Sequence, residues 1–284
     1  MELNVVKTEI NIGVKSPVKL LHVTDAHISR AYEDEGEKLT SLAKRHAENI
    51  FGGIGVAEGY FDAAIKYAKE NDLLPVYTGD MYDFLSRSNF DFLDEKLSET
   101  DYIYTAGNHD FCTRPGADVE DEAFKAKQMK IVQPHIKNDL VFYSRTVNGL
   151  SIVAMDDSYN QFGEKQLTLL KNEIKKGLPT VIFLHNPIYS EKQAEKKLEK
   201  EDSAYVVAPP EKILARYTPA RAEYQRATDV TLRTVEYIKS EPLIKAIFAG
   251  HLHWNFEEPL ADCGIMQYTT GALFSGYARE IIIK

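Results

Sequence analysis

Short apolar runs alternate along this chain with stretches of helical periodicity, and this alternation limits the folds that the sequence can adopt. Between the apolar runs, apolar side chains recur every three or four residues in 56–70, 165–175 and 229–239, a spacing that favours amphipathic helices. The runs themselves have the length and composition of buried strands. They are residues 18–23, 73–77, 102–105, 151–155, 180–184 and 243–248. Strands that alternate with helices predict an α/β fold with layers of helices against sheets.

Other segments predict strands that run in both directions. Residues 141–147 and 151–155 flank Asn148-Gly149, a pair that suits a tight turn with positive φ, and this arrangement predicts a hairpin. Two further strand-like segments, 264–269 and 279–283, lie near the carboxyl end. We therefore expect sheets of mixed direction. No shift in composition divides the 284 residues, so we expect 1–284 to form a single domain.

Charge, apolar segments and cysteine content argue against several classes of protein. The chain has 43 acidic and 34 basic residues, and its net charge of −9 disfavours a protein that grips nucleic acid through phosphates. Its apolar runs are shorter than the roughly 18 residues of a membrane span, and the first ten residues lack the apolar segment of a signal peptide. Cys112 and Cys263 have no CxxC partner, which agrees with a reducing compartment. We expect a cytoplasmic protein that does not bind membranes.

Residues suited to chemistry follow the predicted strands. They are Asp25 and His27, Asp80 and Asp83, Asn108, His109 and Asp110, His185, and His251 and His253. In open α/β sheets the loops at the carboxyl ends of strands converge, and ligand crevices form there. Five of the eight histidines fall in these loops. The other three, His22, His46 and His135, lack this setting, and we expect structural or solvent-exposed roles for them.

A bound cation explains why carboxylates and imidazoles should gather at one edge. The pair His251 and His253 alone is also compatible with one packed and one exposed imidazole. A cluster of all these groups, however, would lose hydration at a cost of several kcal/mol per charge unless a cation compensates. Mixed nitrogen and oxygen ligands suit Mn, Fe or Zn better than Ca or Mg. The candidate ligands are too many for one ion, so the sequence predicts two, bridged by Asp80.

The ordered motifs DAH, GDMYD, GNHD, His185 and GHLH resemble the signature of the calcineurin-like metallophosphoesterases, and they extend over most of the chain. This resemblance implies a four-layer α/β/β/α sandwich with two mixed sheets and a site for two divalent or trivalent ions. It implies that His109 is catalytic and that Asp110 orients it. The ligands that it implies are Asp25, His27, Asp80 and His253 for one ion, and Asp80, Asn108, His185 and His251 for the other.

Such a site predicts hydrolysis of a phosphate monoester or diester, with a phosphorylated small molecule or another phosphoester as substrate. Coordination lowers the pKa of water toward about 7, so a hydroxide that bridges the metals can attack phosphorus. His109 would then protonate the leaving oxygen or stabilise the transition state as an imidazolium. Two alternatives are a nuclease with the same chemistry and a noncatalytic metal-binding scaffold on the same fold.

Three residues beside the motifs have two interpretations each. Asp83 either accepts a hydrogen bond from a ligand imidazole or begins a helix, since metal-bound histidines usually donate their second N–H to a carboxylate or carbonyl. Asp110 could cap the following segment instead of orienting His109. Cys112 could lie near the site, although a packed thiol is the simpler interpretation.

Two segments are expected to select the substrate. One is the long connection 28–72, which includes an acidic loop, 33–37, and the glycine-rich stretch 51–59, and the other lies between the last two motifs. We expect a cap-like insertion within residues 186–240. This segment contains Arg216, Arg221 and Arg226 among several tyrosines, a composition that suits a phosphate-binding surface and equally an ordinary helix surface. Its basic run, 192–200, alternates lysines with glutamates at helical pairing distances, which indicates a solvated helix face.

Overall fold

The strands of the computed structural model, which describes residues 1–118, 120–261 and 263–284, form two mixed sheets. The first sheet has the order β1 (Asn4–Ile10), β11 (Tyr277–Ile283), β2 (Val18–Val23), β3 (Leu74–Tyr77) and β4 (Ile103–Tyr104). The second has the order β5 (Phe142–Val147), β6 (Leu150–Met155), β7 (Thr180–Phe183), β8 (Ile244–Ala249), β10 (Met266–Thr269) and β9 (Phe256–Pro259). Strands β2, β3 and β4 are parallel, as are β6, β7, β8 and β10. Within each sheet, the carboxyl ends of these parallel strands therefore lie along the same edge.

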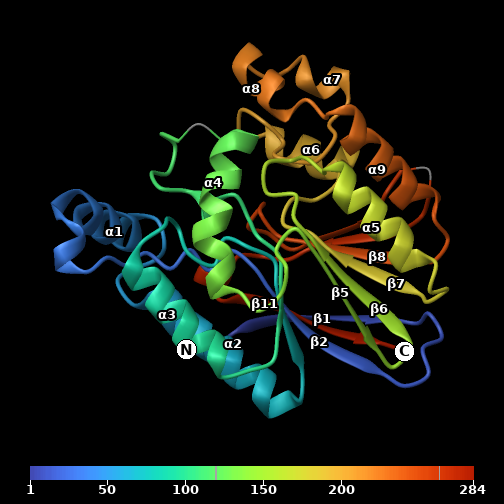
Figure 1. Cartoon of the computed structure of the whole chain (residues 1–284), viewed down its shortest axis with the longest axis horizontal. Helices are drawn as coiled ribbons and strands as arrows, with labels where there is room; N and C mark the ends of the chain where they lie inside the picture. The colour runs from blue at the N-terminus through green and yellow to red at the C-terminus, as the bar shows by residue number, and fades with distance from the viewer. Residues whose placement is uncertain (119, 262) are drawn as a thin grey trace.

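Helices cover the outer faces of both sheets (Figure 1). On the first sheet lie α2 (Val56–Asn71), α3 (Arg87–Ser98) and α4 (Glu122–Val132), and on the second lie α5 (Glu164–Ile174) and α9 (Asp229–Ser240). The remaining helices are α1 (Glu37–Asn49), α6 (Glu191–Leu198), α7 (Glu211–Leu214) and α8 (Pro219–Gln225). Among the described residues, no helix is long and apolar enough to cross a membrane.

Three apolar clusters separate the layers. One lies between the sheets, where Leu20 and Ile103 of the first face Ile152 and Phe183 of the second. A second joins the outer face of the first sheet to α2 and α3, and a third joins the second sheet to α5 and α9. Side chains therefore alternate between two buried faces along each central strand, which explains why these strands are apolar throughout. The predicted four-layer α/β/β/α sandwich with two mixed sheets is confirmed.

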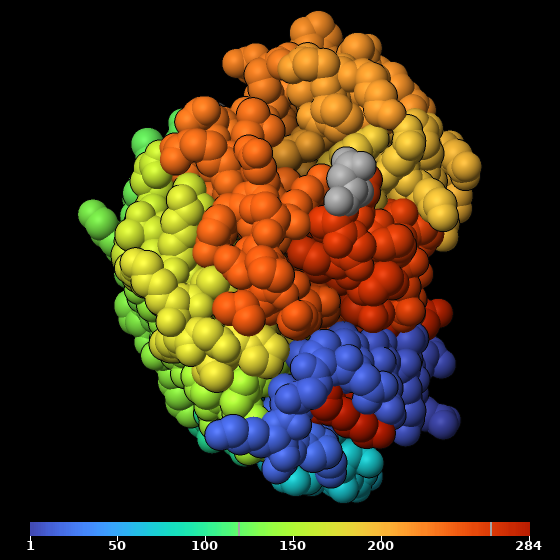
Figure 2. Space-filling model, turned by 90° about the vertical axis from the view of Figure 1, so that its right-hand side faces the viewer, coloured from blue at the N-terminus to red at the C-terminus, as the bar shows by residue number. Residues whose placement is uncertain are grey.

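The predicted hairpin is also present, and the two ends of the chain meet in one sheet. Strands β5 and β6 are antiparallel, and Asn148 and Gly149 between them have φ values of 50° and 84°. Strand β1 runs parallel to β11, so the amino-terminal and carboxyl-terminal strands are neighbours. Figure 2 shows their blue and red residues side by side on the lower part of the molecule. Strand β11 therefore lies between β1 and β2 in the first sheet.

Helices α6, α7 and α8 form a small unit at the top of the molecule in Figures 1 and 2. Their apolar cluster contains Ala194, Val206, Ile213 and Leu214, and it packs on Leu252 from the loop after β8. Helix α9 also falls within 186–240, but it packs on the second sheet. Helix α6 covers most of the basic run 192–200, with Gln193 and Ala194 buried and its lysines exposed or only partly buried.

Candidate metal centre

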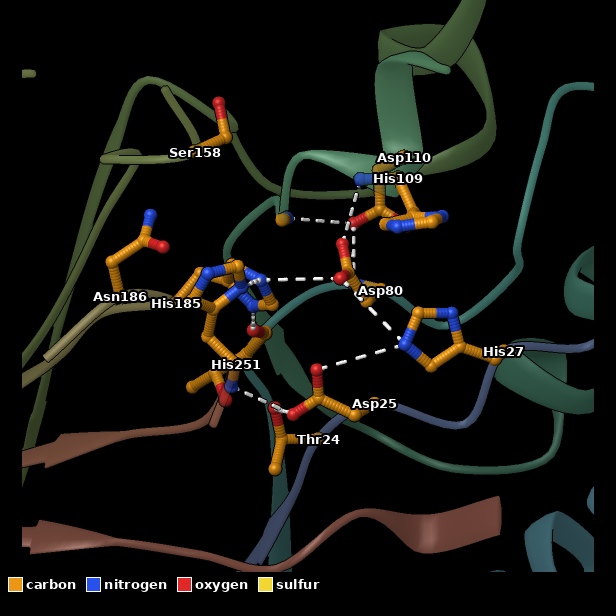
Figure 3. Close-up of polar contacts among 12 residues, drawn as sticks. Thr24, Asp25, His27, Asp80, His109, Asp110, Ser158, His185, Asn186 and His251 are labelled. Atoms are coloured by element: carbon orange, nitrogen blue, oxygen red, sulfur yellow. Dashed lines mark hydrogen bonds and ion pairs between the residues drawn. The ribbon is translucent and has the colours of Figure 1, made fainter. Parts of the chain in front are cut away.

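The loops at the carboxyl ends of five strands bring the predicted ligands together between the two sheets. Asp25 and His27 follow β2, Asp80 follows β3, and His185 follows β7. Figure 3 shows the side chains of Asp25, His27, Asp80, His185 and His251 pointing toward one another. Their potential ligand atoms form two groups, Asp25 with His27 and His253, and Asp80 with His185 and His251; within each group these atoms lie within 4.8 Å of one another.

The first group has its nitrogen and oxygen atoms turned inward. His27 Nε2 and His253 Nε2 are 3.3 Å apart, and Asp25 Oδ1 lies 3.8 Å from the former and 3.3 Å from the latter. The His253 side chain is 40% exposed, whereas Asp25 is fully buried. This group is therefore open to solvent on the His253 side.

Asp80 joins the two groups. Its Oδ2 atom lies 3.2 Å from His185 Nε2 and 3.8 Å from His27 Nε2. His185 Nε2 in turn lies 3.0 Å from His251 Nδ1. One carboxylate oxygen is thus shared between two sets of nitrogen atoms, which is the arrangement that a bridging ligand requires.

Hydrogen bonds hold one oxygen of each carboxylate and leave the other facing the cluster. Asp25 Oδ2 accepts from Thr24 Oγ1 at 2.7 Å and from the His251 backbone N–H at 2.8 Å. Asp80 Oδ1 accepts from the His109 N–H at 2.8 Å. Asp25 Oδ1 and Asn108 Oδ1 are buried and have no hydrogen-bond partner among the described residues. Buried polar atoms normally have partners, so these two oxygens fit metal ligands.

Carbonyl and carboxylate groups behind the imidazoles set their orientation. His185 Nδ1 donates to the Thr78 carbonyl oxygen at 2.6 Å, and this contact leaves Nε2 as the nitrogen with a free lone pair. His27 Nδ1 lies 3.4 Å from Asp83 Oδ1. Metal-bound histidines usually have such a partner on their second nitrogen, so His185 fits a metal ligand. The contact of His27 is an ion-pair distance only, and its Nδ1 atom has no hydrogen-bond partner among the described residues.

The electrostatics of the cluster favour added positive charge. Burial opposes ionisation of Asp80, but the neighbouring His185, His109 and His27 together outweigh it and hold the carboxyl pKa well below its usual range. Burial likewise opposes the charged form of His185, and Asp80 nevertheless raises its pKa to about 10. For His27 and His251 burial prevails and lowers the pKa. The carboxylates are therefore anionic and His27 and His251 neutral, the donor types that a transition metal takes, whereas His185 holds a proton that it would have to release as a metal ligand.

The backbone of the ligand loops is strained. Asp25, His27, Asp80, His251 and His253 have φ values of 54°, 48°, 54°, 64° and 62°, in the left-handed region that residues other than glycine seldom adopt. Two loops are tied together, since the Asp25 and His27 N–H groups donate to the carbonyls of Gly79 and Asp80 at 3.1 and 2.9 Å. Strain of this kind persists where surrounding contacts impose it, and it clusters at functional sites.

Glycine is required where the loops approach each other. A Cβ atom on Gly107 would lie 2.7 Å from both the Asp80 nitrogen and His185 Cε1, and one on Gly250 would lie 2.7 Å from Asp25 Oδ2. Real Cβ atoms do not approach other atoms this closely. The motif glycines Gly79, Gly107 and Gly250 are therefore required on steric grounds, because a side chain at any of them would overlap a neighbouring loop.

The prediction that Asp110 orients His109 is wrong. Asp110 accepts hydrogen bonds from the N–H groups of Asp80 and Gly107 at 3.1 and 2.9 Å and from the Tyr104 hydroxyl at 3.1 Å. Both residues belong to one turn of 3-10 helix, so neighbouring side chains point in different directions. Asp110 is fully buried and fixes the metal-site loops, and burial raises its pKa to about 7.

Asp83 occupies the role that was expected of Asp110. Its Oδ1 atom lies 3.0 Å from His109 Nδ1, and its backbone carbonyl lies 2.9 Å from the same nitrogen. Burial opposes the charged form of His109, but Asp80 and Asp83 outweigh it and raise the pKa to about 10. Asp83 also lies near His27, so its expected support of a ligand imidazole agrees with the geometry.

A comparison with protein families identifies the fold's relatives. The model of the calcineurin-like phosphoesterases matches residues 18–255. The chain belongs to this family. No curated protein sequence matches the chain.

Two solved structures have a fold similar to that of this calcineurin-like chain. A dimetal phosphatase from Danio rerio matches with a TM-score of 0.53 and 13% identity, over 90% of this chain and 88% of that one. A purple acid phosphatase from yellow lupin (Lupinus luteus) seeds matches with a TM-score of 0.54 and 12% identity, over 93% of this chain and 45% of that one. Similarity at this level of identity establishes the fold.

Two features of this family member were missed in the sequence. His46, expected to be structural or exposed, lies 2.6 Å from Asp83 Oδ2 through Nδ1. It comes from α1, away from every motif, so neither spacing nor motif could reveal it. Phe51 stacks on the His27 ring at 4.8 Å, and Phe274 lies 5.1 Å from the His253 ring. These two rings make one side of the calcineurin-like centre apolar.

Other expectations about single residues agree with the structure. His22 is buried and contacts the hydroxyls of Thr78 and Thr270, each at 2.8 Å. Burial, aided by Arg279, lowers the His22 pKa to about 3, as a structural neutral imidazole requires. His135 pairs with Asp94 and lies outside the site. Cys112 is a buried thiol.

Proposed function

We propose that this chain is a dinuclear metal-dependent phosphoesterase. The observation that carries the proposal is the position of Asp80, whose Oδ2 atom reaches His185 on one side and His27 on the other. The buried oxygens Asp25 Oδ1 and Asn108 Oδ1, which have no hydrogen-bond partner among the described residues, support it further. The proposed ligands are Asp25, His27, Asp80 and His253 for one ion and Asp80, Asn108, His185 and His251 for the other.

The proposed chemistry needs two Mn, Fe or Zn ions and a proton donor. When bound, such ions make water more acidic and offset negative charge on the phosphoryl oxygens. His109 is the proposed catalytic group. Asp83 binds its Nδ1 atom and thereby leaves Nε2 to donate a proton to the leaving oxygen. The His109 side chain is 25% exposed, so a substrate can reach it.

The proposed substrates are phosphate monoesters or diesters of small molecules. The net charge of −9 opposes the long-range attraction of a polyanion, and this favours a small phosphoester over nucleic acid. Asp110 is proposed as a positioning residue, because its carboxylate holds the Asp80 and Gly107 backbones and touches neither the ions nor His109 in this scheme.

A metal assay joined to a hydrolysis assay tests this function. The protein is reconstituted with Mn²⁺, its metal content is measured, and turnover of an aryl phosphate monoester and the matching diester is followed. We expect about two ions per chain and turnover of at least one ester, and loss of both in Asp80→Ala, because a bridging carboxylate serves both ions. Two bound ions without turnover of either ester would favour the noncatalytic scaffold, and absence of bound metal would contradict the proposal.

A further inference from the structure

One arginine of the α6–α8 unit, Arg221, contacts a tyrosine that lies beside a proposed metal ligand, and it has no carboxylate partner among the described residues. The Arg221 guanidinium lies over the ring of Tyr205, 5.1 Å from the centroid, and 6.0 Å from the centroid of Tyr224. Arg221 is only partly exposed. Aromatic faces hold a guanidinium by cation–π attraction while its N–H groups remain free at the edges of its plane.

The other two arginines of this unit have carboxylate partners. Arg216 pairs with Glu195 at 2.6 Å, and Arg226 pairs with Glu211. For Arg221, no carboxylate of the described residues lies within 4.0 Å of the guanidinium. The surface of arginines and tyrosines noted in the sequence therefore separates into two structural ion pairs and one guanidinium with free donors.

Tyr205 connects Arg221 to the proposed metal ligands. Its ring lies 5.9 Å from the ring of His251, so the same ring contacts both the guanidinium and a proposed ligand. Tyr205 has a φ of 50°, and for a bulky side chain this conformation is an outlier that surrounding contacts must enforce. Its hydroxyl donates to Asp202 at 3.1 Å. The Tyr205 ring is therefore held in place by its backbone conformation at one end and by the hydroxyl–Asp202 hydrogen bond at the other.

Tyr224 is the second ring that contacts Arg221. Its hydroxyl donates to Glu120 at 2.5 Å, a contact that joins α8 to the loop before α4. The Glu120 carboxylate is thereby engaged by the phenol. The guanidinium thus contacts two anchored rings, and these contacts reduce the conformational entropy that the side chain would lose on binding an anion.

We propose that Arg221 binds a second anionic group, a carboxylate or a phosphate, on the alcohol portion of the substrate. This inference rests on the proposed phosphoesterase function and narrows its substrate class to phosphoesters of negatively charged alcohols. Guanidinium donors form paired, charge-assisted hydrogen bonds with such groups. The opposite side of the centre is apolar, because Phe51 and Phe274 flank His27 and His253 there. The charged end of the substrate therefore lies toward α8.

The inference predicts a change in substrate preference. Three aryl phosphates are compared, with a carboxylate, a phosphonate or neither on the ring, in the Mn²⁺-reconstituted protein. Wild type is expected to show a higher kcat/KM for at least one anionic ester than for the neutral one, and the better anion identifies the source of the charge. In Arg221→Met the ratio of anionic to neutral kcat/KM should fall at least about ten-fold, since a hydrogen bond to a charged group contributes more than a neutral one. Arg221→Lys should restore part of it, because lysine keeps the charge without the fork.

Arg216→Met is the matched control, because this arginine lies on the same unit and pairs with Glu195. Its ratio should equal that of wild type. An unchanged ratio in Arg221→Met, or an equal fall in Arg216→Met, would overturn the inference. Calorimetry gives a second measurement, the affinity for nonhydrolysable analogues in which a phosphonate replaces the phosphate ester of each substrate. If wild type, Arg221→Lys and Arg221→Met bound the anionic analogue with equal affinity, the inference would also be overturned. If wild type hydrolysed none of the three esters, that result would count against the proposed function itself, independently of these ratios.

Discussion

Asp83 positions imidazoles from three separate segments of the chain. Its carboxylate lies 2.6 Å from His46 Nδ1, 3.0 Å from His109 Nδ1 and 3.4 Å from His27 Nδ1. These contacts outweigh burial and hold the Asp83 pKa well below its usual range, so it is an anion near neutral pH. One buried charge therefore sets the orientation of a proposed metal ligand and of the proposed catalytic histidine together.

Replacement of His109 should separate catalysis from metal binding. His109→Ala is expected to lower kcat for an aryl phosphate about 10²–10⁴-fold, the usual contribution of a positioned proton donor. Its metal content should stay at the wild-type value, because the scheme assigns no ion to His109. Steady-state kinetics and metal analysis of the same preparation measure both. His135→Ala is the control, since His135 pairs with Asp94 away from the site. Loss of metal in His109→Ala would show that this histidine is a ligand.

The motifs predict which residues gather but not every contact among them. Asp80 could be expected to bridge because it follows a central strand. The directions in which the His109 and Asp110 side chains point could not be predicted from the sequence. They depend on the geometry of one 3-10 turn in which the two residues are neighbours. His46 could not be found either, since α1 reaches Asp83 only through the tertiary fold.

At the scale of secondary structure, the strand ends are built for close approach. Each motif places a small or strained residue where a strand stops, and the loops after β3 and β4 then touch through Gly79 and Gly107. The apolar runs predicted the central strands because both of their faces are buried. Strand β1 was missed because it lies at the edge of its sheet, and within it only Thr8 is buried. Edge strands carry little of the apolar signal on which such predictions depend.

A methyl group on Gly107 should damage the site without a change in side-chain chemistry. In Gly107→Ala the new Cβ would press on the Asp80 backbone nitrogen and on His185. We expect overpacking to destabilise the protein by about 1–3 kcal/mol and metal affinity to fall at least about ten-fold, because both ligands must move. Denaturant unfolding and Mn²⁺ titration measure the two effects.

Gly163→Ala is the matched control for this substitution. A Cβ on Gly163 would meet only Gln166 Oε1, at an ordinary distance of 3.6 Å, and its backbone has a φ of −105°. This variant should keep wild-type metal affinity and lose no more than about 1 kcal/mol of stability, as a change at a helix start does. If Gly107→Ala bound Mn²⁺ as tightly as Gly163→Ala, the close packing of the loops would not be what sets the ligand geometry.

At the scale of the whole molecule, the proposed centre depends on both sheets. The first sheet supplies Asp25, His27 and Asp80, and the second supplies His185 and His251. The apolar layer between the sheets fixes their separation, and hydrogen bonds such as that from the His251 N–H to Asp25 cross it at the edge. The layered architecture could be predicted from the alternation of strands and helices. The facing of the two sheets, which creates the centre, followed only from the family resemblance.

Because ligands from both sheets would be joined by the ions, metal binding should stabilise the entire sandwich. An ion that binds only the folded state adds about 4 kcal/mol at a concentration of 1,000 times its Kd. For a domain somewhat smaller than this one, each kcal/mol raises the Tm by about 2–4 °C. We therefore expect chelator-treated protein to unfold at least about 5 °C below the Mn²⁺-reconstituted protein in calorimetry. The Asp80→Ala variant should show a much smaller difference, because it lacks the shared carboxylate. Equal Tm values for chelated and reconstituted wild type would mean that the two sheets hold the cluster together without metal, and that the imidazoles and carboxylates compensate one another through hydrogen bonds alone.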